Sequence, residues 1–465
     1  MHALNTLPLL TRSRALLCGL FAAFSVGCVP DPKQLPPPII IVSLDTVRAD
    51  ELSCYSGPDD ATPVLDAFAA KSTRFARCIA AAPWTLPSHA SMFTGFFPSE
   101  HGAHSFLPGE GYQGDNVFAL HESFKTLAEA LGDRGYRSGG FVANSIYLRP
   151  GLGLEAGFGT WDVRRSEARF VTERALGWLD EVKAAERPTF LFINYLDAHR
   201  PYRTGEPEDR ARERLDELIE QVMVKGHEPR ELGDDVSRLH QKAVTVLDGE
   251  LERLFKGLEE RGLFDRAVIV VTSDHGEAFG AHGVVEHSKD VYEDLVSVPL
   301  LVKAPGQTTG AVSEEIASSV DVPGLIAREL RGTEAGTLAA FFARVPGNHP
   351  VLSENHFSRQ KDIARYGSRF RRVRRALYGE ELKLIEGSDG SLELFDMAAD
   401  PREERDLSQE RRDEAERLAA ELHRFLGSHS YDGPAALPSD LTQRQLEDLE
   451  VLGYGGSGKK DAAGH

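Results

Sequence analysis

Three short apolar runs, each followed by polar residues, constrain the fold of this chain more than any other feature. They span residues 39–44, 189–195 and 267–272 and are rich in β-branched and aromatic side chains. Continuous apolar runs of this length are typical of buried strands in a parallel sheet. Amphipathic stretches with helical spacing precede the second and third runs. This alternation predicts an α/β domain with a mostly parallel central sheet flanked by helices.

The residues that follow the three runs are of types that bind metals and substrates. They are Asp45, Asp197, His199, Asp274 and His275. Ligands of open parallel sheets bind beyond the carboxyl ends of the strands, so the pattern places these residues along one edge. Aspartate also serves in turns after strands, but that explanation suits one such ending better than three. The sequence therefore predicts a polar site at this edge.

A further signal lies in segment 83–95, which reads Pro-Trp-Thr-Leu-Pro-Ser-His-Ala-Ser-Met-Phe-Thr-Gly. Pro87 suits the first turn of a helix, where its missing N–H is not needed. Thr85 would then lie just ahead of the helix N-terminus, where free N–H groups and the helix dipole favour an anion. A hydroxyl at that place suits attack on a phosphate or sulfate ester. Taken alone, the segment fits a threonine that only caps the helix at least as well.

These segments resemble, in order along the chain, the landmarks of the sulfatase family in the alkaline phosphatase superfamily. Segment 83–95 is similar to the family signature of Cys or Ser, any residue, Pro, Ser and Arg, ending in Thr-Gly. The family's metal-binding, histidine and C-terminal segments are matched by residues 43–50, 197–202, 272–277, 292–300 and 393–401. The resemblance covers roughly residues 38 to 425. It implies an alkaline phosphatase-like sheet with a small C-terminal α+β subdomain.

The chain departs from the family pattern at the nucleophile. Thr85 stands where sulfatases have the Cys or Ser that becomes formylglycine, and its β-methyl group prevents that oxidation. Its hydroxyl would instead form a covalent ester, as in threonine-using relatives such as lipoteichoic-acid synthases, phosphoethanolamine transferases and nucleotide pyrophosphatases. His89 replaces the Arg that steadies the family's nucleophile. The family's Lys-x-His pair is absent from segment 140–145, where Asn144 is expected to give the substrate one hydrogen bond.

The resemblance also implies one divalent metal ion, held by Asp45, Thr46, Thr85, Asp274 and His275. Thr46 stands where sulfatases have a second Asp ligand. The likeness to sulfatases favours Ca²⁺, whereas the threonine and imidazole in the ligand set favour Zn²⁺ or Mn²⁺. The ion would stabilise a Thr85 alkoxide and the charge that develops on the ester.

Two further histidines, His199 and His287, are implied by the resemblance to face the ester. There they would hold an oxygen or protonate the leaving group. An alternative is a second metal bound by Asp197, His199 and His287, because paired ions can clamp the attacking and leaving oxygens. The Asp-x-His spacing is shorter than in two-metal relatives, so a single metal is the main prediction.

The first 37 residues differ in character from the rest of the chain. Arg12 and Arg14 precede an apolar run from 15 to 29, which is shorter than the roughly 20 residues that a membrane-spanning helix needs. The run ends at Ser-Val-Gly-Cys and resembles a bacterial lipoprotein signal, with Cys28 as the lipidated residue. A plainly cleaved signal and an uncleaved anchor are the alternatives. The proline-rich stretch that follows is expected to be an extended tether.

The chain is accordingly divided into five parts. These are a signal (1–28), a tether (29–37), a catalytic domain (38–345), a C-terminal subdomain (346–430) and a tail (431–465). The protein is expected to be exported and to lie in the periplasm or on the outer membrane through its lipid anchor. In the oxidising environment outside the cytoplasm, Cys54 and Cys78 fit either a disulfide or two buried thiols.

Charge limits the partners that this chain can bind. The net charge of −19 argues against nucleic acid, which is bound through clustered Lys and Arg. The one dense basic run, 369–375, is expected to be a solvated face, with a patch for an anionic substrate as the alternative. The expected partner is an anionic ester, for example on a glycan or a lipid head group.

Three functions remain open from the sequence. The first is metal-dependent hydrolysis of a sulfuric ester with Thr85 as the covalent nucleophile, which the overall resemblance favours. The second is a phosphodiesterase, phosphonate hydrolase or phosphotransferase, which the threonine and the missing Lys-x-His pair favour. The third is an inactive lipoprotein that only binds glycans.

Overall fold

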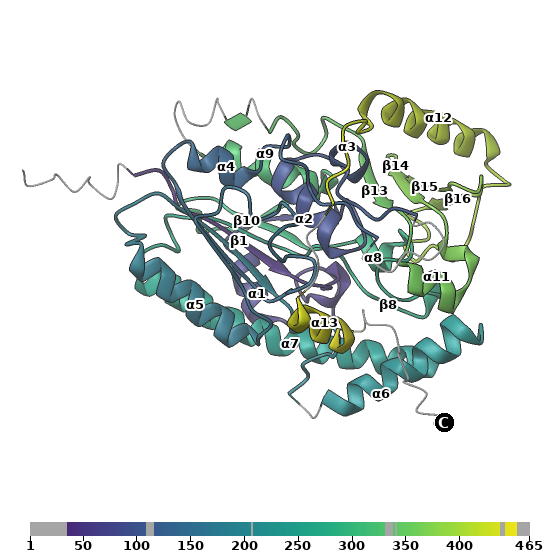
Figure 1. Ribbon diagram of the computed structural model, residues 1–465, viewed down its shortest axis with the longest axis horizontal. Coiled ribbons are helices and arrows are strands. Elements are labelled where there is room, and N and C mark those ends of the chain that lie inside the picture. The colour runs from purple at the N-terminus through teal and green to yellow at the C-terminus, as the bar shows by residue number, and fades with distance from the viewer. Residues whose placement is uncertain are drawn as a thin grey trace, which may run out of the picture.

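A computed structural model describes residues 35–107, 116–205, 208–330, 338–339, 342–437 and 442–452 (Figure 1). The predicted signal with its lipidation residue Cys28, most of the tether and the last residues of the tail lie outside this range. Within the described residues, none of the helices has the length and apolar character needed to span a membrane.

A sheet of eight strands forms the centre of the larger domain, in the order β11-β2-β10-β7-β1-β6-β4-β5. Its middle strands are the three predicted runs, β7 (Val268–Thr272), β1 (Ile39–Leu44) and β6 (Thr189–Tyr195), and every residue in them is buried. β1 is parallel to both of its neighbours, whereas β10 is antiparallel to both of its own. The prediction of a mostly parallel sheet is therefore confirmed. The other strands are β2 (Thr73–Phe75), β4 (Arg137–Val142), β5 (Thr160–Val163), β10 (Leu300–Lys303) and β11 (Ala311–Ser313).

Helices cover both faces of this sheet (Figure 1). α5 (Ala168–Glu181) and α7 (Arg230–Glu260) pack together on one face. α2 (Thr85–Thr94), α4 (Leu127–Gly132) and α9 (Val322–Glu329) lie on the other. Each long helix buries one apolar stripe, as the amphipathic spacing predicts. Shorter elements are α1 (Pro63–Ala69), α3 (Pro98–His101), α6 (Glu208–Ile219), α8 (Glu293–Val296), β3 (Cys78–Ile79), β8 (Ala278–Phe279), β9 (Val285–Glu286) and β12 (Ala317–Ser318).

The C-terminal subdomain is an antiparallel sheet of four strands covered by one helix. The strands are β13 (Val351–Asn355), β14 (Arg374–Tyr378), β15 (Leu382–Gly387) and β16 (Leu392–Asp396). Leu418 and Leu422 of α12 (Arg412–His429) pack on this sheet. This arrangement confirms the predicted α+β subdomain. A further helix, α11 (Gln360–Tyr366), lies between β13 and β14.

Part of the basic run differs from its predicted role as a solvated face. Arg374 is buried in β14, where its guanidinium pairs with Asp290 at 3.0 Å and Glu393 at 2.7 Å. The contact with Asp290 joins the subdomain to the segment that carries His287. Arg369 and Arg371, by contrast, are exposed.

Two further features bear on the sequence predictions. Within the predicted tail lies a helix, α13 (Gln443–Val451), whose Asp448 accepts a hydrogen bond of 2.6 Å from the Ser145 hydroxyl. Leu452 behind it is buried in the core of the large domain. Cys54 and Cys78 are both free thiols, which answers the question of the disulfide.

Candidate active site

The proposed nucleophile stands at the start of a completely buried helix. α2 begins at Thr85 itself, with Trp84 as the N-cap residue, so Thr85 lies one position further into the helix than predicted. Pro87 occupies the first turn, and Gly95 ends the helix in the left-handed conformation with φ of 74°. The Ser88 hydroxyl donates to the Asp274 carbonyl at 2.6 Å, which ties the helix to the end of β7. The N-terminus of α2, where the helix dipole favours negative charge, therefore lies at Thr85.

Asp45 and Asp274 both lie close to this hydroxyl. Only one oxygen of each carboxylate accepts hydrogen bonds from the rest of the protein. Asp45 Oδ2 accepts hydrogen bonds from the amides of Asn144 at 3.1 Å and Asn194 at 3.3 Å. Asp274 Oδ1 accepts the backbone N–H groups of Thr46 at 3.4 Å and His275 at 3.0 Å. The other oxygens, Asp45 Oδ1 and Asp274 Oδ2, are buried without a hydrogen-bond partner among the described residues. Bare buried carboxylate oxygens require a cation or a proton.

His275 completes this group, and its hydrogen bonding fixes the tautomer. Its Nδ1–H donates to the Gly276 carbonyl at 2.9 Å, because a carbonyl oxygen can only accept. The lone pair is therefore on Nε2, which lies 3.4 Å from Asp274 Oδ2, 3.8 Å from Asp45 Oδ1 and 3.5 Å from Thr85 Oγ1. Ligand atoms of Asp45, Asp274 and His275 all lie within 4.8 Å of one another. A metal-binding histidine has this form, with its second nitrogen held by a carbonyl.

The electrostatics of the group favour a divalent cation. Burial raises the pKa of Asp45 to about 8, and repulsion by Asp274 contributes. Burial likewise raises the pKa of Asp274 to about 7 and lowers that of His275. Two bare carboxylate oxygens, an imidazole lone pair and a hydroxyl form a mixed oxygen and nitrogen ligand set. These residues therefore fit the divalent ion that the sequence predicts.

Two histidines extend the site away from Thr85. The His287 ring lies 4.5 Å from that of His275 and 5.0 Å from that of His199, centroid to centroid. Asp197 does not join them: its Oδ1 accepts the Ala168 N–H at 3.1 Å. Among the described residues, only Asp45, Asp274 and His275 form a group with metal-ligand spacing. The two histidines thus lie beside the site, and Asp197, the third residue of the alternative two-metal site, does not form a metal-ligand group with them.

Comparison with known proteins identifies the family to which this chain belongs. Residues 37–328 match the model of the family described as Sulfatase, which is more than half of the chain. The chain belongs to the sulfatase family. It is 22% identical over 318 residues to the uncharacterized sulfatase YidJ of Escherichia coli, with 58% of this chain and 63% of that protein covered. It is 24% identical over 366 residues to human arylsulfatase A, with 66% of each chain covered. The chain thus spans less than two thirds of the length of YidJ and about two thirds of arylsulfatase A.

The fold is also shared with solved structures. The crystal structure of phosphonate monoester hydrolase of Agrobacterium radiobacter superposes with a TM-score of 0.62 at 19% identity. The match covers 84% of this sulfatase-family chain and 95% of the hydrolase. This likeness confirms the alkaline phosphatase-like fold that the sequence predicts.

Three predicted residues of this sulfatase-family protein are placed differently from expectation. The Thr46 hydroxyl donates to the Asp45 carbonyl at 2.6 Å and so points away from the proposed ion, while its N–H supports Asp274. The backbone of Thr46 has φ of 67°, which is strained for a β-branched residue. Asn144 donates to Thr85 Oγ1 at 3.2 Å, so it contacts the nucleophile as well as Asp45. His89 donates to the Thr85 carbonyl at 2.8 Å and holds the backbone, not the hydroxyl.

Several residues of the site were not found from the sequence. Asn194 supports Asp45 from β6, and Glu277 accepts the Nδ1–H of His287 at 2.6 Å. His240 of α7 bonds to Glu51 at 2.6 Å and to the Thr46 hydroxyl at 3.3 Å. Among these residues, only Glu277 could have been predicted from the sequence, since it stands in the segment 272–277 that resembles the family.

Proposed function

We propose that this protein hydrolyses an anionic ester, with a sulfuric ester as the first candidate, through a covalent intermediate on Thr85. The observation that carries the proposal is the position of the Thr85 hydroxyl. It stands at the N-terminus of α2, 3.5 Å from His275 Nε2 and 3.2 Å from Asn144 Nδ2, beside two bare carboxylate oxygens. This combination of nucleophile, hydrogen-bond donor and metal ligands is what ester cleavage needs.

The chain's own residues supply positioning and charge stabilisation. Asp45, Asp274 and His275 would hold a divalent ion, which when bound lowers the pKa of the Thr85 hydroxyl and offsets charge on the ester. The Asn144 amide donates toward the oxygen that becomes an alkoxide. His89 fixes the backbone of Thr85, and its Nε2 accepts from the Ser43 hydroxyl at 3.1 Å. Thr85 Oγ1, after releasing its proton to solvent, would bond to the sulfur or phosphorus atom as the bond to the alcohol oxygen breaks, and the leaving alcoholate would take up a proton from solvent.

The second step needs a base that activates water, and two histidines suit that role. The Nδ1–H groups of His199 and His287 donate to the Arg200 carbonyl at 2.9 Å and to Glu277 at 2.6 Å. Burial lowers the pKa of His199 to about 3 and that of His287 well below its ordinary value. Both rings are therefore neutral, which is the form of imidazole that can accept a proton. That water attacks the sulfur or phosphorus atom of the intermediate. The bond from this atom to Thr85 Oγ1 breaks, and Thr85 regains its hydroxyl.

A phosphodiester or phosphonate monoester is the second candidate substrate. The observation that favours it is the β-methyl group of Thr85, which excludes the formylglycine chemistry of sulfatases. The fold likeness to phosphonate monoester hydrolase agrees with this alternative without deciding it. We also propose that the chain is exported and anchored through Cys28, as its N-terminal sequence indicates.

The direct test is turnover of three aryl substrates side by side: a sulfate ester, a phosphodiester and a phosphonate monoester. We expect Mn²⁺- or Zn²⁺-loaded protein to cleave the sulfate ester with the highest kcat/KM. A reversed order would make the phosphorus ester the function. No turnover of any substrate, with glycan binding retained equally by wild type and Thr85→Ala, would instead show an inactive binding protein.

Replacing Asn144 by alanine tests the proposed support of the nucleophile. We expect kcat to fall about 100-fold with little change in KM, because the lost donor acts mainly on the charged form of the Thr85 oxygen. Steady-state kinetics on the best of the three substrates would measure this. A kcat within threefold of wild type, in a variant with unchanged thermal unfolding, would contradict the role.

A further inference from the structure

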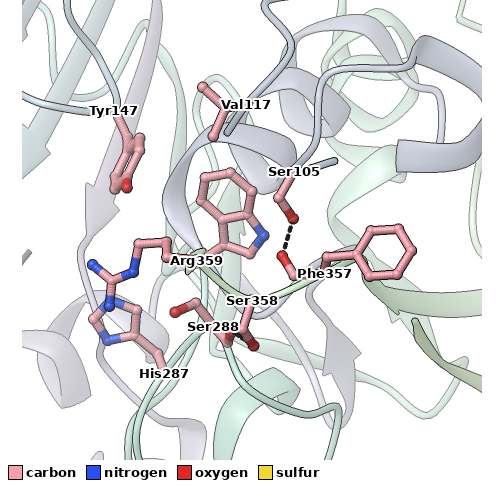
Figure 2. Close-up of a pocket in the computed structure, with 9 residues that line it drawn as sticks. Ser105, Val117, Tyr147, His287, Ser288, Phe357, Ser358 and Arg359 are labelled. Atoms are coloured by element: carbon pink, nitrogen blue, oxygen red, sulfur yellow. Dashed lines mark hydrogen bonds between the residues drawn. The ribbon is translucent and has the colours of Figure 1, made fainter. Parts of the chain in front are cut away.

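Two groups of side chains adjoin the proposed metal ligands. One of them, with His287, Ser288 and Arg359, lines a recess that has room for about one water molecule and so cannot hold a substrate (Figure 2). The other surrounds His240 of α7, which contacts the turn that follows β1 and carries Asp45. A side chain at that place can act on the ligands of an ion without touching the ion itself.

His240 is a completely buried polar residue in the middle of α7. Its Nδ1 bonds to Glu51 Oε1 at 2.6 Å, and its Nε2 lies 3.3 Å from the Thr46 hydroxyl oxygen. The rings of Tyr202 and Phe279 pack beside it, with centroids 5.0 and 5.3 Å from that of the imidazole. Burial of a polar ring costs free energy unless its nitrogens have partners, and here both nitrogens have one.

The direction of these hydrogen bonds follows from the hydroxyl. Thr46 gives its only hydroxyl proton to the Asp45 carbonyl at 2.6 Å, so its oxygen must accept from the Nε2–H of His240. The other ring nitrogen shares a proton with Glu51, which makes the histidine and the glutamate neutral as a pair and so permits their burial. Glu51 belongs to the short 3₁₀ helix η1 (Ala49–Glu51), which follows the turn. His240 thus connects α7 both to the turn after β1 and to the helix behind it.

The contact with His240 is made where the backbone is strained. Thr46 has φ of 67°, and residues in this conformation persist only where the surrounding structure holds them. Its N–H donates to Asp274 Oδ1 at 3.4 Å, while Asp274 Oδ2 is bare. If the turn relaxed, Oδ1 would lose one of its two N–H donors, and the carboxylate would be less firmly oriented. The orientation of a proposed metal ligand therefore depends on a turn that His240 supports.

We propose that His240 and Glu51 form a positioning pair for the divalent ion. Through the Thr46 hydroxyl, the pair holds the turn after β1 in the form that aims the bare oxygens of Asp45 and Asp274 at the ion. His240 is a positioning residue, since it acts through Thr46 and contacts neither the ion nor the substrate. This inference rests on the metal site of the proposed function.

The test measures the affinity of the full chain for Mn²⁺ by calorimetry. His240→Phe keeps an aromatic ring beside Tyr202 and Phe279 but removes both nitrogens. We expect its Kd to rise about 10- to 100-fold, which is the usual effect of losing an outer partner of a metal ligand. Asp248→Asn changes another buried polar residue of α7, about two turns further along, and is the matched control. Its Kd should stay within about threefold of wild type, because distant sites act independently.

Variants of Thr46 test the route by which His240 acts. Thr46→Val removes the hydroxyl and should raise the Kd for Mn²⁺ about as much as His240→Phe does, whereas Thr46→Ser keeps the hydroxyl and should bind within about threefold of wild type. The double variant of His240→Phe and Thr46→Val should bind no more weakly than either single variant, because both changes break the same contact.

Three results would overturn the proposal. The first is a Kd within about threefold of wild type in His240→Phe or, if that variant does not fold, in Thr46→Val. The second is a double variant at least about tenfold weaker than His240→Phe, since the Thr46 hydroxyl would then bind the ion directly. The third is a wild type that binds neither Mn²⁺ nor Zn²⁺, which would remove the proposed metal site as well.

Turnover of the three aryl esters separates this inference from the catalytic proposal. If none of them is cleaved but the Kd for Mn²⁺ depends on His240 as described, the positioning role stands and the catalytic proposal fails. If an ester is cleaved and His240→Phe binds Mn²⁺ as wild type does, the positioning role fails and the catalytic proposal stands.

Discussion

Replacing Thr85 by alanine is expected to lower kcat/KM by at least about 10⁴-fold, because the variant lacks the hydroxyl that forms the proposed covalent intermediate. Thr85→Ser should keep activity within about tenfold of wild type, since it retains the hydroxyl at the start of α2 and loses only the methyl group. Steady-state kinetics with the best substrate would measure both. Thr94→Ala is a matched control in the same helix, where the Thr94 hydroxyl donates to the Ala90 carbonyl at 2.7 Å and accepts the Phe96 N–H at 3.3 Å. That change should affect stability and leave kcat unaltered.

Rapid quenching provides a second readout for the nucleophile. Wild type mixed briefly with an aryl sulfate should yield a Thr85 peptide that is heavier by roughly 80 Da, and Thr85→Ala should not. An adduct on another residue, or full activity in the alanine variant, would remove the basis of the proposed mechanism. The same experiment with an aryl phosphodiester, read at high mass accuracy, would show whether a phospho group forms in place of the sulfo group.

The sequence places Asp45, Asp274 and His275 together because each stands within three residues of the end of a buried strand. Asp45 follows β1, and Asp274 and His275 follow β7, and these two strands are parallel neighbours. Residues at the carboxyl ends of neighbouring parallel strands lie close together, whatever the conformation of the connecting loops. The resemblance to the family added Thr85 and His287, which the strand pattern alone does not place.

The residues that the sequence missed depend on register and on packing over long distances. Asn194 reads as part of an apolar run, and only the pairing of Ser43 with Asn194 places its amide near Asp45. His240 stands in the middle of α7, where a polar residue suggests a solvated face, yet it is buried against Glu51. For Thr46, the resemblance places a hydroxyl where the family has a carboxylate, whereas this hydroxyl donates to the Asp45 carbonyl at 2.6 Å.

The second large effect is expected on the free energy of unfolding of the metal-free protein when Asp45 is replaced. Because the folded pKa values of Asp45 and Asp274 are about 8 and about 7, the folded state binds more protons than the unfolded state above the ordinary value of 3.8. The free energy of unfolding therefore falls as pH rises from about 4 to about 8. Asp45→Asn removes one of the two charges, and its new amide N–H can donate to the bare Asp274 Oδ2.

Metal-free Asp45→Asn is accordingly expected to be more stable than metal-free wild type by about 2–4 kcal/mol at pH 8. The difference should shrink by about 2 kcal/mol at pH 5, where the carboxyls of the folded wild type are already protonated. Urea unfolding in EDTA at both pH values would measure it. Adding Mn²⁺ or Zn²⁺ should then stabilise wild type by about 4 kcal/mol at 1,000 times its Kd, and the variant far less.

Asp248→Asn is the matched control for this experiment. Both Asp248 oxygens accept backbone N–H groups, of Val64 and Leu65, at 2.9 Å, so an amide there places a donor against a donor. This variant should lose about 1 kcal/mol or more at pH 8 and keep the full response to metal. If metal-free Asp45→Asn were instead less stable than wild type at pH 8, Asp45 would be satisfied without an ion. The proposed metal site would then lose its main physical support, because the bare oxygens of the two aspartates are what call for a cation.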